Sequence, residues 1–164
     1  MPAEIFGEKY EFLPRPHILT FEEIERLTRL FVAAGVSKIR VTGGEPLVRA
    51  DLPELIAKLS AIDGVDDLTL TTNGYLLAQH AGALRDAGLG RLTISLDSLD
   101  EEIFKKMSGR PQSPEKTLEG IKVASDLGFS PIKINVVVQR GMNEHTLVDT
   151  ARYFRGTGAI VRFI

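Results

Sequence analysis

A pair of glycines followed by a carboxylate and a proline is the stretch with the clearest capacity for chemistry. Gly43, Gly44, Glu45 and Pro46 come directly after a short β-branched run that begins at Lys38. Paired glycines tolerate positive φ and let a ligand approach the bare main chain. A glutamate placed there can accept hydrogen bonds from an ammonium group. The alternative is a tight strand-to-helix turn with a surface glutamate, because short glycine motifs match by chance.

Polar side chains alternate with apolar ones along the five strands that the sequence predicts. The strands are expected at residues 38–42, 67–72, 91–96, 132–138 and 159–164. Their polar positions include Arg40, Thr71, Ser95, Lys133 and Arg162. In a curved, barrel-like sheet such a face lines the interior, where two guanidinium groups and an ammonium would surround an anionic, phosphate-bearing ligand. The alternative is an exposed sheet face in a two-layer protein.

Helices are expected between these strands to hold them in place. Thr20 and Glu23 form a capping box at the start of the first helix, and Gly35 follows its end. Asn143 is expected to cap the last helix. Strands that alternate with helices predict βα units and parallel pairing. The glycine pair and the other polar motifs then fall at the carboxyl ends of strands, where barrels carry their chemistry.

Composition limits the number of domains and the classes of binding partner that the chain can have. The chain has 164 residues, of which 43% are hydrophobic, and no linker divides it, so residues 1–164 are expected to form a single domain or part of one. Its 20 basic residues nearly balance its 22 acidic ones, which argues against a nucleic-acid or membrane-surface partner. No apolar run is long enough for a membrane span and no signal peptide is visible, so we expect a cytoplasmic protein.

The chain contains no cysteine. Disulfides, thiolate nucleophiles and cysteine-held metals are therefore excluded for this chain. The three histidines, His17, His80 and His145, are far apart in the sequence and form no metal-binding spacing. We expect no metal ligand and assign no catalytic residue.

Several motifs together resemble one enzyme family. They are Thr42–Leu47, Thr71–Gly74, Ser95–Asp100 and Lys133–Val137, with Met1–Glu4 at the start and Tyr153–Arg155 and Arg162–Ile164 at the end. In order and spacing they resemble the radical S-adenosylmethionine (radical SAM) enzymes. Within that superfamily the full set is similar to the molybdenum cofactor biosynthesis protein A (MoaA) family, the GTP 3′,8-cyclases. The glycine-pair motif alone would indicate only the superfamily.

The resemblance implies a fold and a set of roles. The fold would be α/β, a partial (β/α)6 TIM-like barrel with about five parallel strands and outer helices. Residues that match cofactor-binding positions for S-adenosylmethionine are Gly43, Gly44, Glu45 and Ser95. Residues that match GTP-binding positions are Arg40, Thr71 and Lys133. In the family, a reduced [4Fe–4S] cluster and S-adenosylmethionine generate a radical that converts GTP into a cyclised pterin precursor.

The chain departs from that family in one respect, because it lacks the cysteines that hold the iron–sulfur cluster. Iron–sulfur clusters need thiolate ligands, so this chain should be inactive alone and is expected to be the central part of a longer enzyme. The second hypothesis is a cluster-free module that binds a nucleotide or an adenosyl ligand without catalysis. In either case a partial barrel would be open along both sheet edges, and open edges favour self-association into a homo-oligomer.

Overall fold

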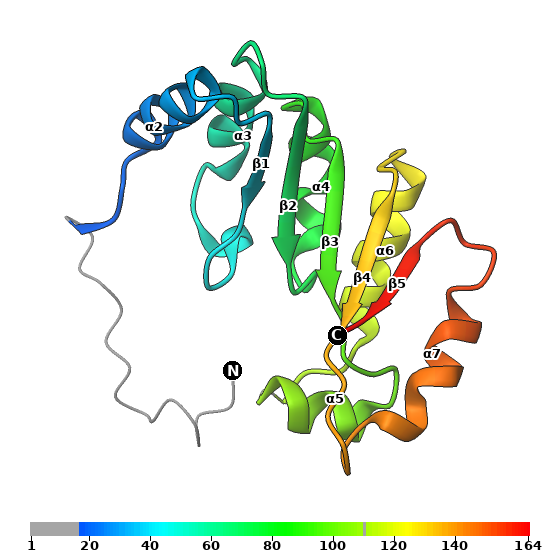
Figure 1. The fold of residues 1–164 in the computed structure, drawn as a ribbon. Coiled ribbons are helices and arrows are strands. Elements are labelled where there is room, and N and C mark those ends of the chain that lie inside the picture. Colours follow the sequence, from blue (N-terminus) through cyan, green and yellow to red (C-terminus); the bar gives the residue numbers. More distant parts are fainter. Residues whose placement is uncertain (1–16, 110) are drawn as a thin grey trace.

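A computed structural model describes residues 17–109 and 111–164 of the chain (Figure 1). The resemblance at Met1–Glu4 lies outside these residues. The strands are β1 (Lys38–Val41), β2 (Asp67–Thr72), β3 (Arg91–Ser95), β4 (Ile132–Val136) and β5 (Ile160–Phe163). They form one sheet in the order β1-β2-β3-β4-β5, and every neighbouring pair is parallel. The predicted α/β class and the five parallel strands are confirmed, and within the described part of the chain the sheet is open at β1 and β5.

Helices connect successive strands. They are α2 (Phe21–Ala33), α3 (Leu52–Ser60), α4 (Leu77–Asp86), α5 (Glu101–Ser108), α6 (Glu115–Asp126) and α7 (Leu147–Tyr153), with 3-10 turns η2 (Pro46–Val48) and η3 (Glu144–Thr146). The capping box is confirmed, because Thr20 Oγ1 accepts from the Glu23 amide and Glu23 Oε2 accepts from the Thr20 amide. Of the helices that the structure describes, none has the length and hydrophobicity that crossing a bilayer requires.

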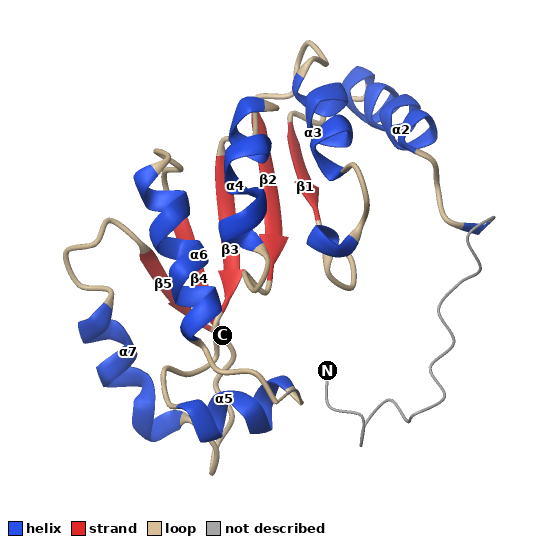
Figure 2. Ribbon diagram, turned by 180° about the vertical axis from the view of Figure 1, so that it is seen from behind, coloured by secondary structure: helices blue, strands red, loops and turns tan. Residues whose placement is uncertain are grey.

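The helices α3, α4 and α6 cover one face of the sheet, as Figure 2 shows from behind. Leu70, Ile94 and Ile134 point into this layer and are fully buried. Each comes from one of the three central strands, at a position that alternates with the polar residues of that strand. The apolar half of the predicted alternation therefore forms the core. Burying such side chains stabilises the fold by about 1.5–3 kcal/mol each.

The polar half of the alternation lies on the opposite face. Residues that are paired across parallel strands share a face, so the register groups the polar side chains into rows. The rows are Arg40–Thr69–Arg91, Thr71–Thr93–Lys133 and Ser95–Asn135–Arg162. Every residue expected on a strand to bind a ligand therefore lies on the face that α3, α4 and α6 do not cover (Figure 1).

Helix α6 packs unusually close to the start of α4 at Gly120. A Cβ at Gly120 would lie 2.8 Å from the Gly74 carbonyl oxygen and 2.9 Å from the Leu77 Cβ. Gly74 has φ 75°, a conformation that favours glycine, and it ends the turn between β2 and α4. The missing side chain at Gly120 thus lets a helix approach this turn, which also borders the site described below.

Two local predictions differ from the structure. Strand β4 ends at Val136 rather than Val138, although the Val138 amide still donates to the Ile164 carbonyl beyond the end of β5. Asn143 precedes η3 but its side chain makes no capping bond there. That side chain instead reaches two loops, so tertiary hydrogen bonds outweigh its local preference for capping.

Candidate functional site

A cavity of about 330 Å³ lies at the carboxyl ends of the first three strands. Its wall includes Thr42, Gly43, Gly44 and Glu45 after β1, Thr71, Thr72, Asn73 and Tyr75 at the end of β2, and Ser95 and Asp97 at the end of β3. Phe104, Met107, Ser108 and Gln112, from α5 and the chain after it, and Thr117 of α6 complete it. This position agrees with the general rule that α/β sheets bind ligands beyond the carboxyl ends of their strands.

Glu45 is held in place by both of its carboxylate oxygens. Oε1 accepts from the Thr72 hydroxyl at 2.6 Å and from the Leu47 amide at 3.1 Å, and Oε2 accepts from the Asn73 amide at 2.7 Å. These donors fix the carboxylate between β1 and β2 without neutralising its charge. Each carboxylate oxygen has more than one acceptor site, so Glu45 can still bind a cation from the cavity.

The turn from β2 into α4 is fixed by side chains as well. The Thr72 hydroxyl accepts from the Gly74 amide at 3.0 Å, and Asn73 Oδ1 accepts from the Tyr75 amide at 2.9 Å. From α6, the Thr117 hydroxyl donates to the Asn73 carbonyl at 3.0 Å. The segment that presents donors to Glu45 is therefore rigid, which is what a preorganised ligand site requires.

Gly43 and Gly44 act by leaving space rather than by unusual backbone angles. Neither residue is among the glycines with positive φ, so the sequence-based argument from backbone freedom does not apply here. A Cβ at either position would meet nothing within 4 Å among the described residues. Both glycines line the cavity, and their bare backbone is open to a ligand.

Asp97 is a second carboxylate in the cavity wall, and the sequence analysis gave it no role. Its Oδ1 accepts from the Val137 amide at 2.8 Å, a contact between residues 40 positions apart. Burial raises the pKa of the Asp97 carboxyl above its usual range, while the Val137 amide acts in the opposite direction. Asp97 continues the polar alternation of Thr93 and Ser95 past the end of the predicted strand, which is the sequence signal that points to it.

The cavity is acidic. Among the described residues that line it, Glu45 and Asp97 supply two carboxylates, and no Lys, Arg or His is present. A half-buried pair of carboxylates without a basic neighbour favours a cationic ligand and disfavours a polyanion.

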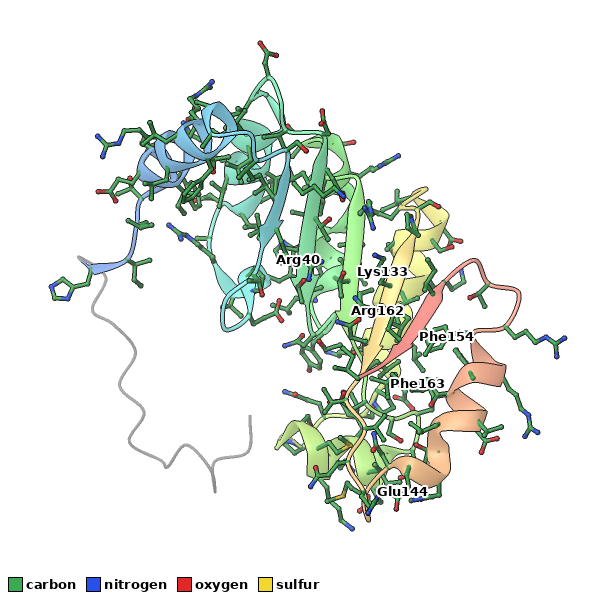
Figure 3. The ribbon with its side chains drawn as sticks, viewed as in Figure 1. Arg40, Lys133, Glu144, Phe154, Arg162 and Phe163 are labelled. Carbon is green, nitrogen blue, oxygen red and sulfur yellow. The ribbon has the colours of Figure 1, made fainter. Side chains whose placement is uncertain are left out.

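The uncovered sheet face beside the cavity is basic. Figure 3 shows Arg40, Lys133 and Arg162 on β1, β4 and β5. Among the described residues, the buried Thr71 Oγ1, Thr93 Oγ1 and Asn135 Oδ1 have no hydrogen-bond partner. A buried polar atom without a partner costs about 1–3 kcal/mol, so these atoms are suited to a polar ligand that would pair them.

The structure brings most of the predicted site residues together, but not all of them. Gly43, Gly44, Glu45, Thr71 and Ser95 line the acidic cavity. Arg40 instead lines an adjoining groove of about 570 Å³ along the free edge of β1, and Thr42 lines both hollows. Lys133 reaches neither hollow; it lies two strands from Thr71 in the same cross-strand row.

The sequence profile of the radical SAM superfamily matches residues 5–154. The chain belongs to the radical SAM superfamily. Among curated radical SAM relatives, the GTP 3′,8-cyclases of Acidothermus cellulolyticus and Xanthomonas axonopodis pv. citri are both 51% identical over all 164 residues. That of Staphylococcus carnosus is 48% identical over the same length. The chain spans 45%, 49% and 48% of these three proteins, so it covers about half the length of the curated relatives it matches.

Solved structures share the fold. Methylornithine synthase superposes with a TM-score of 0.68 at 18% identity, over 90% of this chain and 44% of that protein. The [FeFe]-hydrogenase maturase HydG superposes with a TM-score of 0.70 at 15% identity, over 95% of this chain and 38% of that protein. The expected fold, part of a TIM-like radical SAM barrel, is thereby confirmed.

Radical SAM enzymes use S-adenosylmethionine and a [4Fe–4S] cluster, and the two groups fit this chain differently. The cluster does not fit, because the chain has no cysteine and its described residues contain no group of three or more His, Cys, Asp or Glu able to hold a metal. S-adenosylmethionine does fit, because the cavity offers a fixed carboxylate for an ammonium and an open glycine backbone for close approach.

Proposed function

We propose that this chain is the central part of a cytoplasmic GTP 3′,8-cyclase. Such an enzyme would use S-adenosylmethionine radical chemistry to convert GTP into the cyclised pterin precursor of the molybdenum cofactor. Identity of 44–51% to GTP 3′,8-cyclases along the entire chain supports this assignment. The cluster ligands would belong to other parts of the longer protein, so the chain alone would bind ligands without turnover.

The main support for the proposal is that an acidic cavity lies beside a basic sheet face. S-adenosylmethionine has sulfonium and ammonium groups and suits the acidic cavity, whereas a nucleoside triphosphate suits the basic sheet face. The cavity carboxylates are Glu45 and Asp97, and the neighbouring face presents Arg40, Lys133 and Arg162. A site for only one of these ligands would have no need of two adjacent regions of opposite charge.

The residues then divide into two sets. Glu45 would hold the ammonium group, with Gly43, Gly44 and Ser95 beside the rest of the cofactor. When it is bound, S-adenosylmethionine supplies the adenosyl group from which radical chemistry starts. Residues that would hold GTP are Arg40, Thr71 and Lys133. The Thr71 hydroxyl, which has no hydrogen-bond partner among the described residues, would be a donor or acceptor for the substrate.

Replacing Arg40 by alanine should weaken the binding of GTP but not that of S-adenosylmethionine. We expect GTP affinity to fall at least about tenfold, because a guanidinium that contacts a phosphate is lost, while S-adenosylmethionine affinity changes less than about twofold. Calorimetric titration of this chain with each ligand measures both effects. Lys122→Ala is the matched control, because it removes one exposed positive charge from the outer surface of α6. Equal loss of both ligands in Arg40→Ala would contradict the division of roles.

The absence of cysteine also supports a second candidate, a cluster-free module that binds a nucleotide or adenosyl ligand. Both candidates predict binding, so the coding DNA just upstream of Met1 separates them. An in-frame segment that encodes a strand followed by CxxxCxxC supports the cyclase. A stop codon directly upstream supports the binding module.

The chain should also self-associate through its sheet edges. Among the described residues, strands β1 and β5 each pair on one side only, and Ile160 and Phe163 of β5 are 45% and 46% exposed. Sedimentation should show a mass that rises with protein concentration, because unpaired edges template pairing with another copy. Ile160→Lys should reduce this association by adding charge at the edge. A monomer at every concentration would refute the expectation.

A further inference from the structure

The buried side chain of Asn143 joins two loops at the rim of the acidic cavity. Asn143 is 0% exposed, and its Nδ2 donates to the Asp97 and Val137 carbonyls, both at 2.8 Å. Its Oδ1 accepts from the Gln139 amide at 2.8 Å. The carbonyl and amide partners lie 46, 6 and 4 residues away in the chain, so one side chain connects the end of β3 with the segment after β4.

We propose that Asn143 is a positioning residue that fixes the Asp97 carboxylate in the cavity by tying the end of β3 to the segment after β4. The same two segments are joined a second time by the Val137 amide, which donates to Asp97 Oδ1. Asp97 is thus held at two points, because Asn143 donates to its backbone carbonyl and the Val137 amide donates to its carboxylate. Among the described residues, no group donates a hydrogen bond to the other carboxylate oxygen, Oδ2, which is therefore the atom that remains for a ligand.

Loss of the Asn143 amide would loosen this arrangement specifically. Two carbonyls and one amide would lose their partner, and each of these groups that stays shielded from water would cost about 1–3 kcal/mol. The loop that carries Val137 could then separate from Asp97 and admit water. The titratable groups that line the cavity with Asp97 are Glu45 and Tyr75, and among its described lining residues none is basic. Loss of the Val137 hydrogen bond would raise the pKa of the Asp97 carboxyl, whereas hydration would lower it. Burial is the larger of the two causes, so the raised pKa should fall toward its usual range.

The role at the cavity rests on the proposed function, because it assumes that S-adenosylmethionine binds there. A carboxylate fixed beside a cationic ligand contributes by charge and by preorganisation. Asp97→Asn should therefore lower S-adenosylmethionine affinity about tenfold while the Asn143 contacts remain, because they use the backbone of residue 97. Asn143→Leu should lower it several-fold by releasing the same carboxylate.

The test combines two measurements on the ligand-free chain with one on the complex. Asn143→Leu keeps the branched shape of the side chain but removes its donor and acceptor, and Asn143→Ala is the second variant if the larger leucine does not fold. We expect the Val137 and Gln139 amides to exchange with solvent at least about tenfold faster. The Asp97 carboxyl, followed by NMR, should titrate at lower pH than in the original chain. The third measurement is calorimetric titration with S-adenosylmethionine.

Thr150→Val is the matched control. Thr150 is also 0% exposed, but its hydroxyl donates only within the same helical segment, to the Thr146 carbonyl. It should leave the Val137 exchange and the Asp97 titration unchanged. A folded Asn143 variant with the same exchange and titration as Thr150→Val would overturn the inference, as would unchanged affinity in Asp97→Asn. If the original chain binds no S-adenosylmethionine, the proposed function fails, and exchange and titration still decide the role of Asn143.

Discussion

Glu45→Gln is expected to weaken S-adenosylmethionine binding at least about tenfold and to destabilise the fold by about 1–3 kcal/mol. The carboxylate accepts from two backbone amides, those of Leu47 and Asn73, with different oxygens. A glutamine has one oxygen, so in either orientation its NH₂ group faces one of these N–H donors. The charge that would pair with the ligand ammonium is lost as well. Calorimetric titration and urea unfolding measure the two effects separately.

Glu119→Gln is the control for this substitution. Glu119 is exposed on α6 and lies outside the cavity wall, so both affinity and stability should change little. If Glu45→Gln lowers only the stability and binds S-adenosylmethionine as tightly as the original chain, Glu45 serves only as an anchor for the turn. That outcome would remove the cofactor role proposed for it.

Gly120→Ala is expected to destabilise the protein by about 1–3 kcal/mol, although alanine is the better helix former. The intrinsic helix preference favours alanine by about 1 kcal/mol. The new methyl group, however, would meet the Gly74 carbonyl oxygen at 2.8 Å and the Leu77 Cβ at 2.9 Å. Backbone and a buried side chain cannot move aside without cost, so overpacking decides the sign. Thermal unfolding should show a melting temperature lower by several degrees.

Gly82→Ala provides the opposite expectation in the same fold. Gly82 lies inside α4, and a Cβ there would meet nothing within 4 Å among the described residues. Alanine should therefore stabilise the chain by up to about 1 kcal/mol. If Gly120→Ala raises the melting temperature as Gly82→Ala does, the close packing of α6 on the β2–α4 turn is not present in solution.

Local patterns were sufficient to predict the strands and the face on which the ligand residues lie. The alternation at Arg40, Thr71 and Lys133 is a property of each strand by itself, and parallel register then brings these residues into rows. Glu45 could be selected because it follows two glycines at the end of a strand. Its fixed orientation could not, since it depends on Thr72 and Asn73, which are 27 and 28 residues away.

The contacts at the rim of the cavity could not be predicted from the sequence either, because they too join residues far apart in the chain. Asn143 has a strong local preference for capping the helix that follows it, and that preference led to the wrong role. Its actual partners include the carbonyl of Asp97, 46 residues earlier. Such pairings are set by how the loops after β3 and β4 meet, and no periodicity in the sequence encodes that meeting.

Thr71 belongs to both regions of the site. It lines the acidic cavity, and it lies in the same cross-strand row as Lys133 on the basic face. If both ligands bind, thermodynamic linkage requires that whatever factor one applies to the affinity of the other is returned unchanged. The order in which the two ligands bind would therefore not change the total free energy of binding, and Thr71 is a residue that both would contact.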